Sequence, residues 1–420
     1  MVSLALRASP STRFNFVRKN YFYPDMPKNF QISQYDKAGG VPISTGGEME
    51  LITDAQKPLR VKLTRIQIEE DPGRLFHPSG LGSSKYTLVD YNRAGVGLLE
   101  IVTQPDLSSP REARVLITKL RSILEHLGVC NTSLEGAMRV DANISMDGNN
   151  RVEIKNISSY KDVERALEYE AVRQSQLIAL GKPIERETRH WLEEKGTTSS
   201  SRAKEEEQDY RYFPEPDIPA VELTEDYIKD IQDSLPELPD SRASRFCRDY
   251  GLTPYDAGVL VLDKALADYF EETVRLYPKP RMVSNWIQTE LLRQLNEKKQ
   301  EISELRFGPK ELAEMLSMID RGEISGKTGK KVVMEMALTG EGPKSIVERL
   351  GLARLGDESA IRALAQRVFE ENPNAVKDAL KNPEAVNFLV GQIMKKISGR
   401  ADPEITNRVV RGLLKAQTSS

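Results

Sequence analysis

Apolar and polar residues alternate between residues 136 and 160, and this alternation predicts an antiparallel β-hairpin. Apolar side chains occupy every second position over 138–146, and a second alternation runs over 152–155. A period of two residues is typical of a strand that buries one face. The Gly/Asn-rich segment 147–150 lies between the two runs and is typical of a turn.

The polar positions of this hairpin form a second face. If the apolar residues of both strands face one core, Asn143 lies near Glu153 and Asp141 near Lys155, and the loop has an odd number of residues. This face then carries both charge signs, with Arg139 at its start. It is either an ordinary solvated sheet face or a polar floor for a charged ligand, and composition alone does not separate these alternatives.

Acidic residues accompany two further predicted strands. The β-like segment 59–68 runs into the Glu-Glu-Asp sequence at 69–71, where consecutive carboxylates repel one another unless water or a cation surrounds them. Glu100 lies within the apolar strand 98–103, and a buried carboxylate is costly unless it is paired or bound to a metal. We therefore consider a cation site, with a solvated turn as the alternative for 69–71.

Helical periodicity surrounds the hairpin and dominates the rest of the chain. Ser109 and Glu112 form a capping box at the start of a helix that runs to residue 128, and a second helix covers 160–180. The charged, apolar-poor segment 193–209 is predicted as a loop. From residue 224 onward only helical patterns occur.

These patterns predict an α+β protein with three domains. An antiparallel β-rich domain with flanking helices covers 1–223, an all-α helical domain covers 224–350, and a small all-α tail domain covers 351–420. Basic residues gather late in the tail domain, where they are either contacts to a nucleic-acid backbone or ordinary surface charge. The residues of this basic set are Lys395, Lys396, Arg400 and Arg408.

Composition excludes several classes of protein. The 420 residues carry a formal net charge of −3, so the chain is not a uniformly basic nucleic-acid binder. Its two cysteines form no CxxC pair and cannot build a zinc knuckle, and no apolar run approaches the ~20 residues of a membrane span. Residues 1–20 resemble a transit peptide in composition, but Pro10 interrupts any long helix there, so we expect a cytoplasmic rather than an organellar protein.

Several long motifs follow one another along nearly the whole chain. They are RKNYFYPDMPKNFQISQ (18–34), IEEDPG (68–73), LVDYNRAGV (88–96), LLEIVTQPD (98–106), RVDANIS (139–145), EIKN (153–156), DYRYFPEPD (209–217) and FLVGQIMKK (388–396). In these motifs the chain closely resembles the B subunit of the aspartyl/glutamyl-tRNA amidotransferases. The resemblance implies that residues 1–223 form a catalytic cradle and that the helical and tail domains grip tRNA.

The resemblance also implies a reaction. Members of the family use ATP and Mg²⁺ to phosphorylate the side-chain carboxylate of mischarged Asp-tRNA(Asn) or Glu-tRNA(Gln), and ammonia then displaces the phosphate. The glutaminase, which is the A subunit, supplies the ammonia, and a small C subunit completes a heterotrimer. No P-loop is required, which agrees with segment 322–328, where three residues separate the glycines and a Walker A loop needs four.

The matching motifs also imply roles for individual residues of this sequence. Glu70 and Glu100 are implied as magnesium ligands, and Lys19 and Tyr21 as nucleotide contacts. Glu135 is implied near the exit for ammonia. The implied reaction floor comprises Arg139, Asp141, Asn143, Glu153 and Lys155. The implied tRNA contacts are the basic set of the tail domain.

Two alternatives stay open. Members of the family normally begin with a Glu-x-His metal pair and a cysteine-bearing zinc segment, and this sequence starts after both. The chain could therefore be a tRNA-binding subunit or fragment without chemistry. The second alternative is the related archaeal E subunit, which carries a large inserted domain that this sequence does not show between Asp217 and the helical region.

Overall fold

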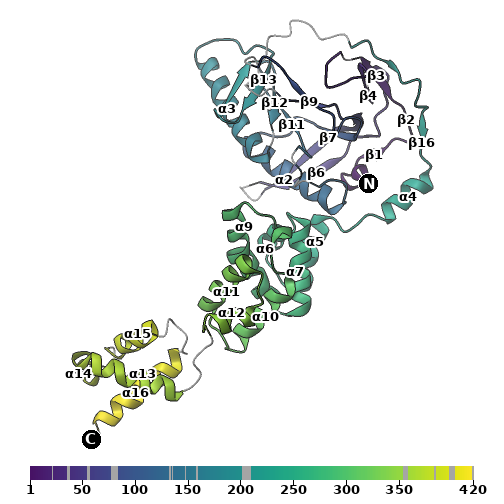
Figure 1. Ribbon diagram of the computed structural model, residues 1–420. Helices are drawn as coiled ribbons and strands as arrows, with labels where there is room; N and C mark the ends of the chain where they lie inside the picture. Colours follow the sequence, from purple (N-terminus) through teal and green to yellow (C-terminus); the bar gives the residue numbers. More distant parts are fainter. Residues whose placement is uncertain are drawn as a thin grey trace. The chain divides into compact units, whose positions relative to one another are not determined.

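The computed structural model describes residues 1–20, 22–35, 38–53, 57–76, 84–131, 134, 136–146, 148–157, 159–200, 210–352, 358–382, 385–396 and 403–418 (Figure 1). Within it the chain forms two compact units, Met1–Pro239 and Asp240–Ser420. Strands occur in the first unit and helices in both, which confirms the predicted α+β class. The predicted domain boundaries at 223 and 350 stay predictions.

A long strand, β7 (Pro58–Glu70), organises the first sheet. It pairs with β6 (Glu48–Ile52) along its first half, and with β10 (Gly97–Thr103) along its second half. β5 (Ser44–Thr45) also pairs with β7 and extends the sheet to β1 (Ser9–Pro10), and all these pairings are antiparallel. The acidic end of β7 therefore lies beside the start of β10.

The short strands of the first unit form three further small sheets. β3 (Val17–Asn20) lies between β4 (Phe30–Ser33) and β15 (Phe213–Pro214), so strands lie at both ends of the aromatic segment 20–34. The remaining pairs are β2 (Arg13–Phe14) with β16 (Val221–Glu222), and β8 (Arg74–Phe76) with β9 (Leu88–Asp90). The unit also contains the short helices α1 (Val2–Ala5) and α4 (Glu225–Asp233).

A second sheet contains the predicted hairpin. Its order is β11 (Val140–Ile144), β12 (Val152–Ile157), β13 (Thr188–Leu192) and β14 (Thr197–Ser200), with β12 and β13 parallel. The prediction that 193–209 is a loop is wrong for β14. Its Thr/Ser sequence carries no alternation of its own, but it pairs with β13, whose Trp191 is buried against α3 (Tyr160–Ala179).

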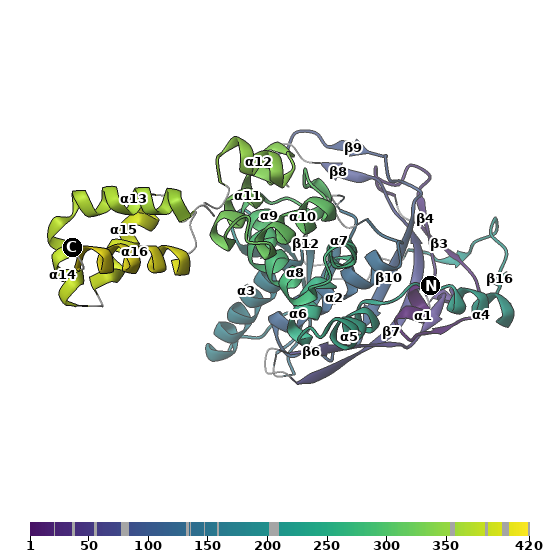
Figure 2. The ribbon, with the colours of Figure 1, turned by 90° about the horizontal axis from the view of Figure 1, so that it is seen from below.

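Helix α2 (Pro110–His126) packs against both sheets and against α3 (Figures 1 and 2). Ser109 caps it as predicted, since its Oγ accepts a hydrogen bond from the backbone N of Glu112 at 3.2 Å. Leu116, Ile123 and Leu124 of α2 join the core of the first sheet, and Ala113 joins the core of the second.

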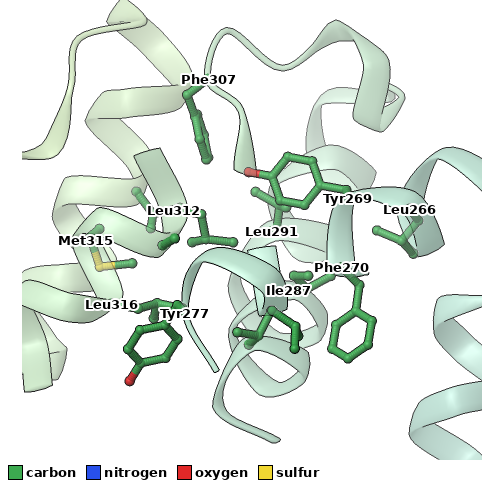
Figure 3. Close-up of a cluster of buried hydrophobic side chains, with 14 of the residues drawn as sticks. Leu266, Tyr269, Phe270, Tyr277, Ile287, Leu291, Phe307, Leu312, Met315 and Leu316 are labelled. Carbon is green, nitrogen blue, oxygen red and sulfur yellow. The ribbon is translucent and has the colours of Figure 1, made fainter. Parts of the chain in front are cut away.

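The second unit begins with a helical bundle around one apolar core. Its helices are α5 (Pro239–Tyr250), α6 (Pro254–Leu260), α7 (Lys264–Leu276), α8 (Pro280–Trp286), the π-helix η2 (Ile287–Leu291), α9 (Leu292–Lys298), the 3-10 helix η3 (Ile302–Glu304), α10 (Pro309–Asp320), α11 (Gly326–Thr339) and α12 (Pro343–Arg349). Figure 3 shows side chains such as Phe270, Ile287 and Leu316 meeting between these helices, and all three are fully buried.

A separate apolar cluster joins the last four helices. They are α13 (Glu358–Glu371), α14 (Pro373–Lys381), α15 (Val386–Lys396) and α16 (Pro403–Thr418). Ala365, Leu389 and Val410 are fully buried in this cluster, and no member of it belongs to the bundle core. Among the helices in the described parts of the chain, none is both long and apolar enough to cross a membrane.

Candidate active site

The register of the hairpin agrees with the prediction from its alternation. Asn143 lies opposite Glu153, and seven residues (145–151) separate the two strands, which is an odd number. A β-bulge then interrupts the ladder, because Ala142 pairs with Ile154 but Val140 pairs with Ile157. The extra residue lies in β12. Its effect is that Ile157 returns to the buried face while Lys155 stays on the polar face.

Lys155 contacts both acids of this face. Its Nζ lies 3.3 Å from Oδ2 of Asp141 and 3.5 Å from Oε1 of Glu153. Partial burial lowers the pKa of Lys155, but the two carboxylates outweigh that effect and raise it above its ordinary value. The side chain of Lys155 therefore stays protonated near neutral pH, and its two ion pairs fix the position of this positive charge.

The parallel pairing of β12 and β13 adds His190 to this face. His190 lies in register with Lys155, and Thr188 of the same strand donates a hydrogen bond to Glu153 at 3.1 Å. Burial and the Lys155 cation lower the pKa of His190, while the nearby carboxylates oppose the shift. Sequence reasoning missed His190, because only the unpredicted strand β13 brings it to the hairpin.

The second group of site residues lies where β7 and β10 pair. Glu100 lies opposite Gln67, whose Nε2 donates hydrogen bonds to Glu100 and to Oε1 of Glu69, the latter at 2.9 Å. Burial, followed by the neighbouring Glu69 carboxylate, raises the pKa of Glu100 to about 7. Two carboxylates thus share a partly buried position, which favours a cation beside them.

Glu70 has a different set of partners. Its carboxylate forms an ion pair with Lys28 and accepts a hydrogen bond from the backbone N of Ile32 at 3.3 Å. In the structure, the carboxylate beside Glu100 is therefore that of Glu69, whereas the resemblance had implied Glu70 as the second magnesium ligand. In the described ranges, no three His, Cys, Asp or Glu side chains lie close enough together to hold a metal ion by themselves.

Asp71 joins the two groups of site residues. Its side chain is only 1% exposed and forms ion pairs with Arg139 and with Nη2 of Arg93, the latter at 3.2 Å. Asp71 directly follows β7, and Arg139 directly precedes β11. The acidic end of the first sheet and the polar face of the hairpin are thereby held together, so the solvated-turn alternative fails for Asp71. The sequence had not indicated Arg93.

The predicted nucleotide contact Lys19 lies on β3, within an aromatic group. Its Nζ lies 4.7 Å from the ring centroid of Tyr210. Tyr212 stacks on Tyr35 with centroids 5.0 Å apart, and burial raises its pKa, to which Glu69 and Glu100 also contribute. The aromatic group therefore lies near the carboxylate pair. Two predicted site residues, Tyr21 and Glu135, lie outside the described residues.

The predicted tRNA contacts belong to the second unit. Lys395 and Lys396 are exposed at the end of α15, and Lys396 forms an ion pair with Glu371 of α13. Arg408 lies on α16, and Arg400 lies outside the described residues. The structure thus brings Lys395, Lys396 and Arg408 into one four-helix cluster, while part of the charge of Lys396 is already neutralised.

Two protein families match this chain. Residues 1–229 match the family described as "GatB/GatE catalytic domain", and residues 268–414 match the family described as "GatB domain". The first match contains every described residue of the two sheets and both groups of site residues. The second contains most of the helical bundle and nearly all of the last four helices.

Curated relatives cover almost the whole chain. A protein of Sulfurisphaera tokodaii is 49% identical over 415 residues, which are 99% of this chain and 87% of the relative. A protein of Thermotoga maritima is 47% identical over 424 residues, with the same two coverages. A protein of Carboxydothermus hydrogenoformans is 45% identical over 420 residues, covering 98% and 86%. Each is named as the B subunit of an aspartyl/glutamyl-tRNA(Asn/Gln) amidotransferase, and this chain belongs to that family.

Proposed function

We propose that this chain carries the site at which mischarged Asp-tRNA(Asn), Glu-tRNA(Gln) or both are amidated. In this proposal ATP phosphorylates the side-chain carboxylate of the attached amino acid. Ammonia then attacks the acyl carbon and displaces phosphate, leaving Asn-tRNA or Gln-tRNA. The family to which the chain belongs supports the reaction class, and the two groups of site residues support its location in the first unit.

The observation that carries the proposal is the ion pair between Asp71 and Arg139. It holds a carboxylate pair and a lysine-bearing sheet face within one unit, although they come from separate sheets. Phosphoryl transfer requires positive groups around the phosphate oxygens and a fixed orientation of the acceptor. Acidic residues for a cation and a held cationic side chain are the complementary parts of such a site.

The carboxylate pair fits Mg²⁺. Proteins usually bind this ion through one or two carboxylates and leave several of its waters in place. Glu69 and Glu100 would supply those carboxylates. Burial, followed by the Glu69 carboxylate, raises the pKa of Glu100, and a cation beside the pair would oppose that shift. When bound, Mg²⁺ would supply positive charge to the phosphate oxygens of ATP. Glu70 remains a proposed ligand only if Lys28 releases it.

The hairpin would hold the group that reacts. Lys155, kept charged by Asp141 and Glu153, presents its ammonium from a sheet face whose backbone is fixed. We propose that it attracts the carboxylate of the aminoacyl group and later the phosphorylated form of that carboxylate. Asn143, in register with Glu153, would orient the same group by hydrogen bonding. Lys19 would contact the nucleotide.

The remaining parts of the proposal concern partners. The names of the relatives describe one subunit of an amidotransferase, so we propose that this chain assembles with a glutaminase subunit and a small third subunit. The glutaminase would supply the ammonia that displaces phosphate. Basic residues of the last four helices would contact the tRNA backbone.

The substitution Asp141→Ala tests the proposal in the assembled complex. It removes one of the two carboxylates that hold Lys155, so we expect ATP-dependent amidation of mischarged tRNA to fall at least ~100-fold, the scale on which electrostatic positioning contributes. Glutaminase activity of the partner should be unchanged. The measurement is conversion of labelled Asp-tRNA and Glu-tRNA, each assayed separately.

Asp230→Ala serves as the matched control, because Asp230 is exposed on α4 and outside both groups of site residues. It should leave amidation unchanged. If the Asp141 variant amidates both tRNAs like the wild type, the placement of the site is wrong. If the wild-type complex binds tRNA but never amidates it, the non-catalytic alternative is correct.

A further inference from the structure

We infer that Arg93 and Arg139, held side by side by Asp71, form a binding subsite for a phosphate-type anion. The inference rests on the proposed function for its setting and adds a residue, Arg93, that the reaction floor had not included. It also assigns Asp71 a positioning role. The ligand class follows from the chemistry of two guanidinium groups, which match the oxygens of phosphate in planar, two-pronged hydrogen bonds.

The burial of Asp71 is the first argument. A carboxylate that is 1% exposed loses nearly all of its hydration, and that loss is compensated only by close positive charge or hydrogen bonds. Arg93, in the segment before β10, and Arg139, directly before β11, provide this charge. The cluster of three residues carries a net charge of +1.

The second argument is that the two arginines are fixed but not enclosed. Arg93 donates from Nη1 to the carbonyl oxygen of Gly136 at 2.6 Å, in addition to its contact with Asp71. The side chain of Arg93 is still 43% exposed and that of Arg139 is 53% exposed. A guanidinium has five N–H donors, so each group retains donors on its exposed side.

The backbone around Asp71 is held as firmly as its side chain. The backbone N of Asp71 donates to the carbonyl oxygen of Val96 at 2.9 Å, and that of Gly95 donates to the carbonyl oxygen of Asp71 at 3.0 Å. These bonds tie the segment that carries Arg93 to the end of β7. Donors that are fixed before the ligand arrives bind an anion without a further cost of ordering.

The position of the cluster supplies the third argument. An added Cβ on Gly95 would lie 3.8 Å from Oε1 of Glu70, so this segment passes beside the acidic end of β7. On its other side, Arg139 leads directly into the strand that carries Asp141 and Asn143. A phosphate held by the two arginines would therefore lie beside the acidic end of β7 and next to the strand that carries Asp141 and Asn143.

Binding of inorganic pyrophosphate and phosphate to the full chain tests the inference. Calorimetric titration should show saturable binding to the wild type at low salt. Arg93→Gln should weaken it at least ~10-fold, because one charge-assisted pair of hydrogen bonds is lost, and Arg93→Lys should restore only part of the affinity. The control Arg13→Gln removes an exposed arginine of β2 and should change nothing.

Substitution of Asp71 alone is a weaker test, because the loss of this buried acid would also disturb the fold, so the Arg93 variants decide the outcome. If Arg93→Gln binds pyrophosphate as the wild type does, or if the wild type shows no saturable binding, the subsite is wrong. A loss that Arg13→Gln reproduces would also contradict it, because the effect would then be one of general surface charge.

Steady-state amidation by the assembled complex distinguishes the source of the phosphate. A rise in KM for ATP in Arg93→Gln, with KM for tRNA unchanged, assigns the subsite to a nucleotide phosphate. A fall in kcat with both KM values unchanged assigns it to the phosphorylated aminoacyl group. If neither constant changes, the subsite is wrong, whereas the proposed function itself still depends on the separate Asp141→Ala result.

Discussion

Two carboxylates of the first unit, Asp71 and Glu215, show what an almost fully buried acid does at the scale of one residue. Each is 1% exposed and each is neutralised by arginine. Arg18 bonds Glu215 through two nitrogens, at 2.7 and 3.0 Å, and its guanidinium also lies 4.1 Å from the ring centroid of Phe30. Glu215 therefore fastens the segment after β15 to strand β3.

We predict that Glu215 makes the stability of the first unit depend on acid pH. The hydrogen bonds from Arg18 lower the pKa of Glu215, so its stabilising effect is present above the ordinary glutamate pKa and is lost as the pH falls through the lower, folded value. At pH 7, Glu215→Gln should lower the melting temperature. That difference from the wild type should shrink as the pH falls towards the acid limit of folding.

Circular dichroism at a series of pH values measures this difference. Glu222→Gln is the matched control, because Glu222 forms an exposed ion pair with Arg13 at 3.7 Å and should contribute little at any pH. If the difference in melting temperature between Glu215→Gln and the wild type stayed constant from neutral to acid pH, altered packing around residue 215 rather than the lost charge would explain the variant.

The hairpin shows how one irregular position shapes an element. Asn156 occupies the extra position of the bulge and has a φ of 65°, in the left-handed region that β-branched residues avoid. Its Nδ2 also donates to the carbonyl oxygen of Trp191, at 3.5 Å, in the neighbouring strand. This one residue lets Lys155 face the site and Ile157 face the core.

The change in stability on substitution of Asn156 should therefore depend on whether the new residue can adopt a positive φ, and not on whether its side chain is polar. We predict that Asn156→Val destabilises the protein by roughly 1–2 kcal/mol, because a β-branched residue is strained in the left-handed region. Asn156→Gly should cost less, since glycine adopts this conformation freely. Chemical denaturation measures both, and equal midpoints for the two variants would contradict the role assigned to the bulge.

The sequence predicted those elements whose periodicity is local. The alternation around Asn143 and Glu153 predicted the correct register, and the cap at Ser109 predicted the start of α2. The sequence did not predict β14 or the position of His190, because their pairing depends on strands distant in the chain. It likewise could not pair Asp71 with Arg139, since 68 residues separate them and no local pattern marks that contact.

At the scale of the whole molecule, the apolar cores are separate from one another, and the proposed reaction and the proposed tRNA contacts belong to different units. Both sheets and both groups of site residues belong to Met1–Pro239. The helical bundle and the last four helices have apolar clusters with no member in common. Among the described residues, the last four helices therefore have an apolar core of their own, which makes the proposed tRNA contacts open to a direct test by truncation.

We predict that a chain ending at residue 352 binds tRNA more weakly than the full chain, and that its affinity depends less on salt. Each phosphate contact adds about 0.7–0.9 to the slope of log affinity against log salt, because bound counterions are released. In the full chain, Lys395→Gln combined with Arg408→Gln should lower that slope by about 1.5. Filter binding or anisotropy over a range of salt concentrations measures the slope.

The control removes the same charge elsewhere. Lys57→Gln combined with Arg60→Gln, in the first unit, should leave the slope unchanged. Both residues are exposed; Lys57 directly precedes β7 and Arg60 lies near its start. If the truncated chain and the full chain gave the same slope, the basic residues of the last four helices would not contact the tRNA backbone. If the control lowered the slope as much, the net charge of the protein rather than a tail contact would account for binding.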